Sequence, residues 1–99
     1  MSRTEQSVDL PLLIQKKDKL ADDVSLLLKD IKDLQALTEL LSQNWNGAAA
    51  QTYLSRALAE ISRLNDLYAT AKKLLQDYTL AVSVYRSEEQ RLEEIFLTV

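Results

Sequence analysis

The chain has 99 residues, of which 46% are hydrophobic and 27% are charged, a composition typical of one small folded domain. Its formal net charge is −3, which gives no electrostatic reason to bind nucleic acid or anionic lipid. It contains no Cys and no His, so disulfides, thiol nucleophiles and histidine bases are excluded. Its one Gly and one Pro argue against a many-stranded β fold.

Residues 1–8 are polar and predict a flexible tail. They lack the apolar core of a Sec-type signal peptide, and no later stretch approaches the roughly 18 apolar residues of a membrane span. We therefore expect no stable membrane insertion, and any export must proceed without a conventional leader.

A first helix is predicted over residues of about 10–43, roughly 50 Å long. Asp9 is a plausible N-cap, and Pro11 suits the first turn. Apolar residues then recur at alternating steps of three and four, which is a heptad seam with weak positions at Lys17 and Thr38. The seam residues are Leu13, Leu20, Val24, Leu27, Ile31, Leu34, Leu41 and Trp45.

The two seams are separated by Trp45-Asn46-Gly47, which holds the only Trp and the only Gly. A turn is predicted at about 44–46, followed by a second helix at about 47–96 with Asn46 as a possible N-cap. Only Glu89 interrupts its seam. The seam residues are Ala50, Leu54, Ala57, Ile61, Leu64, Tyr68, Ala71, Leu75, Tyr78, Val82, Tyr85, Leu92 and Phe96.

Two helices joined by a short turn predict an all-α fold, a single-domain antiparallel helix-turn-helix hairpin. A second apolar set lies outside both seams, and one hairpin cannot bury both sets. We therefore expect dimerisation into a four-helix bundle. The interface candidates are Leu28, Leu37, Leu40, Leu58, Leu67, Leu74 and Val84, with Ala81 beside them.

A second motif, Tyr85-Arg86-Ser87-Glu88-Glu89, lies near the end of the second helix. The length of about one hundred residues, the central Trp-x-Gly and this later Tyr-x-x-x-Glu together resemble the WXG family. These proteins are the Esx-type substrates of type VII secretion systems in Gram-positive and mycobacterial bacteria. The resemblance covers essentially the whole chain.

The resemblance implies a helical hairpin that pairs as a homodimer or as a heterodimer with a related hairpin. It also implies export as a folded dimer, from the cytoplasm to the outside, without a cleaved signal peptide. Tyr85 and Glu89 would form the export signal read by the type VII secretion ATPase. In many members this signal lies on a loose tail, whereas Tyr85 here continues a heptad seam.

Helical spacing places Gly47 and Tyr85 roughly 57 Å apart in one chain. In an antiparallel dimer, however, the turn of one subunit lies near the helix ends of the other. Our hypothesis is a composite export signal, made of Trp45 and Gly47 from one subunit and Tyr85 and Glu89 from its partner.

Structural alternatives stand beside these roles. Trp45 can cap the hairpin core, Gly47 can serve the backbone alone, and Tyr85 with Glu89 can be an edge tyrosine beside a solvated carboxylate. The other tyrosines (Tyr53, Tyr68 and Tyr78) are predicted packing residues. We expect no enzyme activity, no catalytic residue, no metal and no cofactor.

Two other functions remain open. One is an intracellular adaptor or chaperone hairpin that binds a helical region of a larger type VII effector or toxin. The other is a plain coiled-coil protein with chance motifs, in which changes at Trp45 and Gly47 affect stability only.

Overall fold

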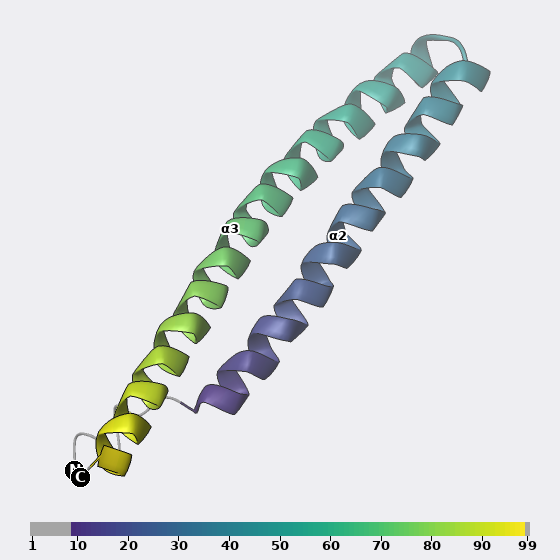
Figure 1. Cartoon of the computed structure of the whole chain (residues 1–99). Helices are drawn as coiled ribbons and strands as arrows, with labels where there is room; N and C mark the ends of the chain where they lie inside the picture. The colour runs from purple at the N-terminus through teal and green to yellow at the C-terminus, as the bar shows by residue number, and fades with distance from the viewer. Residues whose placement is uncertain (1–8, 99) are drawn as a thin grey trace. The chain divides into compact units, whose positions relative to one another are not determined.

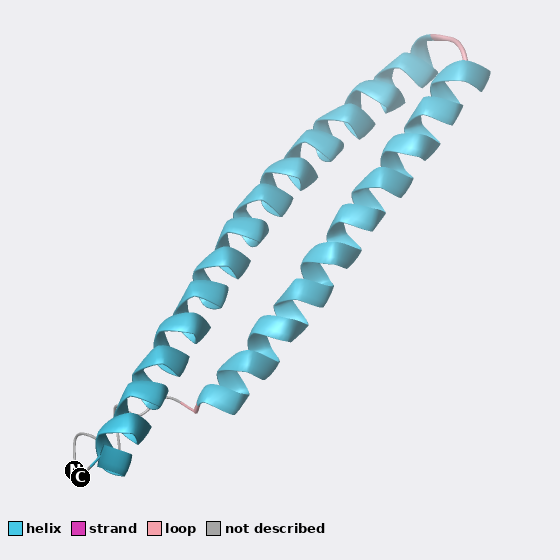
Figure 2. Ribbon diagram, viewed as in Figure 1, coloured by secondary structure: helices cyan, strands magenta, loops and turns pink. Residues whose placement is uncertain are grey.

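The computed structural model describes residues 9–98, and the predicted tail at residues 1–8 lies outside them. Two helices make up almost all of this part, α2 at Leu10–Asn44 and α3 at Ala48–Thr98 (Figures 1 and 2). The predicted all-α class and antiparallel helical hairpin are confirmed. Neither helix is long and apolar enough in any window to cross a membrane.

The turn is formed by residues 45–47, one residue later than predicted. Asn44 stays helical, and its side-chain amide donates a hydrogen bond of 2.8 Å to the Leu40 carbonyl. The amide N–H of Trp45 then donates to the Leu41 carbonyl at 2.9 Å. The Trp45 bond satisfies the Leu41 carbonyl, one of the last four carbonyls of α2, and the Asn44 side chain adds a second donor to the Leu40 carbonyl.

The N-terminus of α2 has a side-chain cap. An Asp9 carboxylate oxygen accepts the amide N–H of Leu12 at 3.1 Å, while the Asp9 carbonyl accepts that of Leu13 at 2.9 Å. Pro11 lies within this first turn, where its missing N–H leaves no intrahelical bond unmade. Asp9 is therefore the N-cap, and it fixes where the helix begins.

The described residues group into two compact units. The turn unit is Asp22–Lys72, which contains the end of α2, the turn and the start of α3. The end unit combines the start of α2 with the end of α3, within Met1–Ala21 and Lys73–Val99. Each unit has its own buried residues and its own surface.

In the turn unit, α2 and α3 run antiparallel and bury a narrow seam between them (Figure 1). Burial follows the predicted heptads, and Ile31 is the largest side chain that is fully buried. The seam is only one side chain wide on each helix, so it forms a stripe. The buried residues of this unit are Val24, Ile31, Thr38, Ala50, Leu54 and Ile61.

Thr38, one of the two weak seam positions, is buried with its hydroxyl paired. This hydroxyl donates to the Leu34 carbonyl one turn earlier, at 2.8 Å. A buried hydroxyl without a partner costs free energy, and this bond avoids that cost. The polar residue is therefore accommodated without interrupting the seam.

In the end unit, the buried residues are Leu10 and Val82. Leu10 was not among the predicted seam residues, although it precedes Leu13 by a seam step of three. Lys17, the other weak seam position, is part-buried along its stem while its ammonium pairs with the Asp18 carboxylate at 3.0 Å. A charged residue thus takes the place of an apolar one, which thins the core of this unit.

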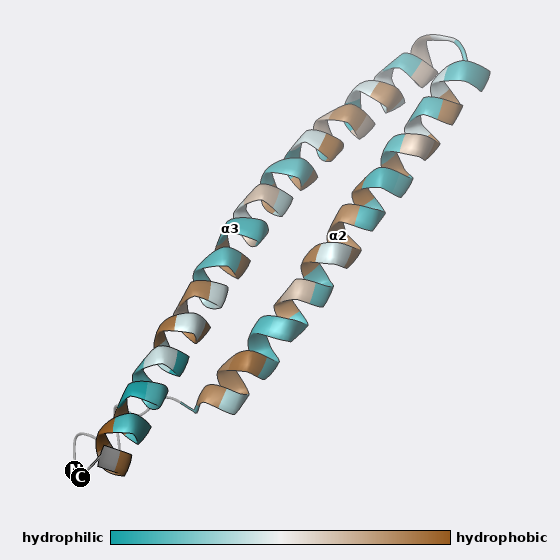
Figure 3. Ribbon diagram, viewed as in Figure 1, coloured by the Kyte–Doolittle hydropathy of each residue, from teal (hydrophilic) through white to brown (hydrophobic). Residues whose placement is uncertain are grey.

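Hydrophobic residues recur along both helices (Figure 3), and many of them are not buried. Among the described residues, seven hydrophobic residues are buried and sixteen large ones are exposed. Scattered exposed leucines are ordinary, but an excess of this size indicates apolar surface that the hairpin alone leaves uncovered.

Candidate functional site

One groove of the helix pair in the turn unit is lined by three apolar and two charged residues. This groove of about 330 Å³ runs between the helices, lined by Leu34 of α2 and by Tyr53, Arg56, Ala57 and Glu60 of α3. Leu34 is only part-buried. Part of the Leu34 side chain is therefore open to solvent beside this groove.

Exposed leucines extend this surface. On α2, Leu37 follows Leu34 by three residues, and on α3, Leu67 follows the part-buried Leu64 by three. Residues three apart on a helix are neighbours on one face. We call the surface of Leu34, Leu37, Tyr53, Leu64 and Leu67 the apolar face.

The groove on the other side of the same seam has a larger share of polar residues in its lining. This groove of about 410 Å³ opens beside the buried Thr38, Leu54 and Ile61. Its outer lining consists of Gln35, Glu39, Ser42, Gln51, Ser55 and Leu58. We call this surface the polar face, and five of these six outer residues carry a hydrogen-bonding side chain.

The end unit shows a similar contrast. Leu12, Leu13 and Tyr78 line one groove, together with Asp9 and Lys16. A separate groove is lined mainly by polar residues, among them Lys17, Ser83 and Arg86. Leucines and an aromatic ring thus gather at one groove, and hydroxyl and cationic groups gather at the other.

The structure distributes the predicted interface residues over more than one surface. Leu37 and Leu67 belong to the apolar face, and Leu40 is exposed three residues after Leu37. Leu58 instead lines the polar face, and Leu28, part-buried, precedes Gln35 of that face by one heptad. In the end unit Leu74 and Val84 are both exposed.

Gly47 occupies the position just before α3. Its φ is +111°, a conformation that L side chains rarely adopt, and a Cβ added there would meet nothing within 4 Å. The requirement for glycine is therefore one of backbone conformation, not of space. The Gly47 carbonyl accepts the Gln51 amide at 3.0 Å, so Gly47 holds the N-cap position predicted for Asn46.

Trp45 projects from the turn and packs against a ring of α3. Its ring centroid lies 5.6 Å from that of Tyr53, and the planes are tilted by 54°. Trp45 is 40% exposed and Tyr53 is 54% exposed. The turn tryptophan is thus a surface residue held by a second surface aromatic.

Tyr85 and Glu89 both lie within the helical part of α3 that belongs to the end unit. Tyr85 is 40% exposed, and Glu89 is exposed as well. Because they are four residues apart on one helix, their side chains share a face. The motif is helical and accessible, whereas Trp45 and Gly47 belong to the turn unit.

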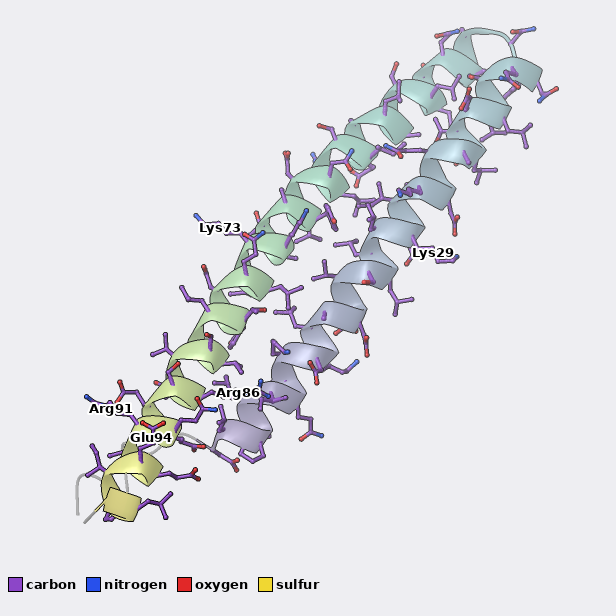
Figure 4. All side chains as sticks on the ribbon, viewed as in Figure 1. Lys29, Lys73, Arg86, Arg91 and Glu94 are labelled. Carbon is purple, nitrogen blue, oxygen red and sulfur yellow. The ribbon has the colours of Figure 1, made fainter. Side chains whose placement is uncertain are left out.

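Several charged groups of the described residues form short-range pairs at the surface. Lys29 donates a 2.8 Å hydrogen bond to Asp33, and this bond raises the pKa of Lys29. Figure 4 shows Lys29 on the side of α2 turned away from α3. Similar pairs join Arg63 to Glu60 and Arg91 to Glu88, each at 3.1 Å. Within residues 9–98, no three acidic side chains gather as a possible metal site.

Two features of the surface were not predicted from the sequence. One is the contact of Tyr53 with Trp45. The other is the apolar end of α3, where Ile95, Phe96 and Leu97 are all exposed. The apolar end of α3 could have been predicted, because three apolar residues follow an acidic cluster in the sequence.

Comparison with protein-family models, with curated proteins and with solved structures gives no match for this chain. A two-helix hairpin of this length is consistent with the WXG family but does not by itself identify it.

Proposed function

We propose that this protein is an Esx-like substrate or carrier of a type VII secretion system, exported as a folded dimer. The observation that carries the proposal is the apolar face of the turn unit, next to an exposed Trp45 in a glycine-containing turn. An apolar surface of this kind requires a partner, and the turn offers an aromatic group for recognition.

The partner of the apolar face is a second helical hairpin, and we take a second copy of this chain as the first candidate. Leu37 and Leu67 are about half exposed in the single chain, at 52% and 53%, so a facing hairpin would remove substantial apolar area from water. The polar face would remain in solvent, which limits the assembly to two hairpins.

The export signal of the proposal is Tyr85 with Glu89, read by the secretion ATPase. Both side chains are exposed on one helical face, as a signal read by another protein requires. In the dimer, we propose that Trp45 and Gly47 of one subunit complete this signal beside the partner subunit.

The test is export of the tagged chain from a bacterium that carries a type VII secretion system. Tyr85→Ala and Glu89→Ala should abolish export while the cell still accumulates folded protein. Tyr78→Ala is the matched control, because Tyr78 is a similarly exposed tyrosine seven residues earlier on α3. Equal export of all three variants and the wild type would overturn the proposed signal.

Export that needs a co-expressed larger effector would instead favour the adaptor function. In that case the apolar face binds a helical region of the effector, and purified chain alone stays monomeric. Leu67→Lys then blocks capture of the effector, whereas in the dimer model it blocks self-association.

A further inference from the structure

We infer that Tyr53 is a positioning residue, which holds the Trp45 indole in one orientation at the turn. This inference rests on the proposed function only for its consequence, which is recognition of Trp45 during export. The contact itself concerns two side chains of the turn unit and can be tested without any secretion system.

The geometry is that of a favourable aromatic pair. The centroid separation of 5.6 Å and the tilt of 54° fall within the range in which tilted rings attract each other. The two residues are eight positions apart in sequence, and the turn between them reverses the chain. The contact therefore links the turn between the helices to the first turns of α3.

Other restraints on the indole are few. The backbone of Trp45 is anchored by its amide bond to Leu41, but the ring lies at the surface. Within residues 9–98 the indole N–H donates no hydrogen bond that would fix the ring. Tyr53 is therefore the group that keeps an exposed indole from sampling several rotamers.

Holding the ring in advance matters for recognition. A partner that binds a mobile side chain must order that side chain, and the lost conformational freedom weakens binding. Tyr53 also lines the groove of the apolar face beside Leu34. The pair thus presents Trp45 at the edge of the surface where we place the partner.

The chemistry of the contact predicts which substitutions matter. The tilted rings interact through their aromatic surfaces, so Tyr53→Phe should keep the indole in place. Tyr53→Ala removes the ring, and Tyr53→Leu keeps apolar volume without an aromatic face. Because Tyr53 is more than half exposed, neither change should remove the buried seam of the turn unit.

Trp45 is the only Trp, so its fluorescence reports this site alone. Time-resolved anisotropy, acrylamide quenching and near-ultraviolet circular dichroism would be compared among wild type, Tyr53→Phe, Tyr53→Ala and Tyr53→Leu. Tyr78→Ala serves as control, since Tyr78 lies in the other unit. The same set is repeated in a Leu67→Lys background, so that a partner subunit is not the cause of any change.

We expect Tyr53→Ala and Tyr53→Leu to lower the residual anisotropy, raise quenching and weaken the near-ultraviolet signal, with far-ultraviolet helicity retained. Tyr53→Phe and Tyr78→Ala should match the wild type. Unchanged anisotropy in a helical Tyr53→Ala protein, or no rescue by Tyr53→Phe, would overturn the inference.

Export then separates the two proposals. Reduced export of Tyr53→Ala, with normal export of Tyr53→Phe, extends the positioning role to recognition. If the wild type itself is not exported, the proposed function fails while the anisotropy result for Tyr53 still stands. If Tyr53→Ala loosens the indole yet is exported normally, the consequence for recognition is wrong.

Discussion

Leu34 and Gln35 are adjacent in α2, yet they line grooves on different sides of the turn unit. The carbonyl of Leu34 also accepts the hydroxyl of the buried Thr38, one turn later in α2. The two sides of the hairpin therefore present different lining residues, and we propose that the side of Leu34 binds the partner.

Two leucines of α3 test whether the sides differ in this way. Leu67 belongs to the apolar face and is 53% exposed, while Leu58 lines the polar face and is 60% exposed. Leu67→Lys should weaken the dimer at least about tenfold, because burying a leucine contributes about 1.5–3 kcal/mol and each 1.4 kcal/mol is a factor of ten. Leu58→Lys should leave the dissociation constant within about threefold of the wild type, since its side faces solvent.

Sedimentation velocity across a dilution series measures both constants. Equal weakening by the two lysines would show that the partner does not prefer the apolar face.

The backbone at Gly47 predicts a second outcome. Gly47→Ala should lower the free energy of unfolding by about 1–3 kcal/mol, because alanine is strained at a φ of +111°. No steric clash contributes, since a Cβ there has open space. Gly47→Asn should lower the free energy of unfolding by less, because asparagine tolerates positive φ better than alanine. Urea unfolding followed by circular dichroism measures the free energy of unfolding of the wild type and of both variants. If Gly47→Ala is as stable as the wild type, alanine is not strained at this position.

The cap at Asp9 predicts a third outcome. Asp9→Ala should cost about 0.5–2 kcal/mol, because the Leu12 amide loses its side-chain acceptor. Asp9→Asn keeps an acceptor oxygen and should stay close to the wild type. Amide hydrogen exchange at the start of α2 would detect the fraying directly. Equal protection in all three proteins would mean that the cap contributes nothing to this helix.

The ion pair of Lys29 and Asp33 should make a small, pH-dependent contribution to the free energy of unfolding. Its hydrogen bond raises the pKa of Lys29 above the ordinary 10.5, so the folded state holds this proton more tightly than the unfolded state. The resulting stabilisation is complete below pH 10.5 and is lost as pH rises through the higher folded pKa.

Because the pair is exposed, its effect should be small and should disappear in high salt. Lys29→Gln should therefore lower the urea midpoint slightly at neutral pH and low salt, and not at all at alkaline pH. Lys32→Gln, a nearby exposed control, should show no such pH-dependent difference. If the lower urea midpoint of Lys29→Gln persists in high salt, the cause is not electrostatic.

The fold was predictable because its signal is repeated many times. Buried positions such as Val24, Ile31 and Leu54 recur at seam spacing, and each repeat supports the same helix pair. The cluster of turn-forming residues around Asn46 and Gly47 indicated the place of the turn, although α2 ends at Asn44, against a predicted end at about residue 43.

The sides of the seam were harder to predict. Spacing identifies residues beside the seam, but it groups Leu58 with Leu67 although they lie on different sides. Only the pairing of the two helices shows which side each one takes. The contact between Trp45 and Tyr53 was missed for a related reason, because it depends on how the turn reverses the chain and on two side-chain rotamers.

The central claim is that the apolar face is covered by a second hairpin, and the molar mass of the purified chain in solution tests it most directly. Light scattering should be measured across a concentration series, with Leu67→Lys and Leu58→Lys in parallel. We expect a stable mass near twice 11.3 kDa for the wild type and for Leu58→Lys. A wild type that stays folded at 11.3 kDa throughout would contradict it, because the apolar face would then be stable in water without a second copy.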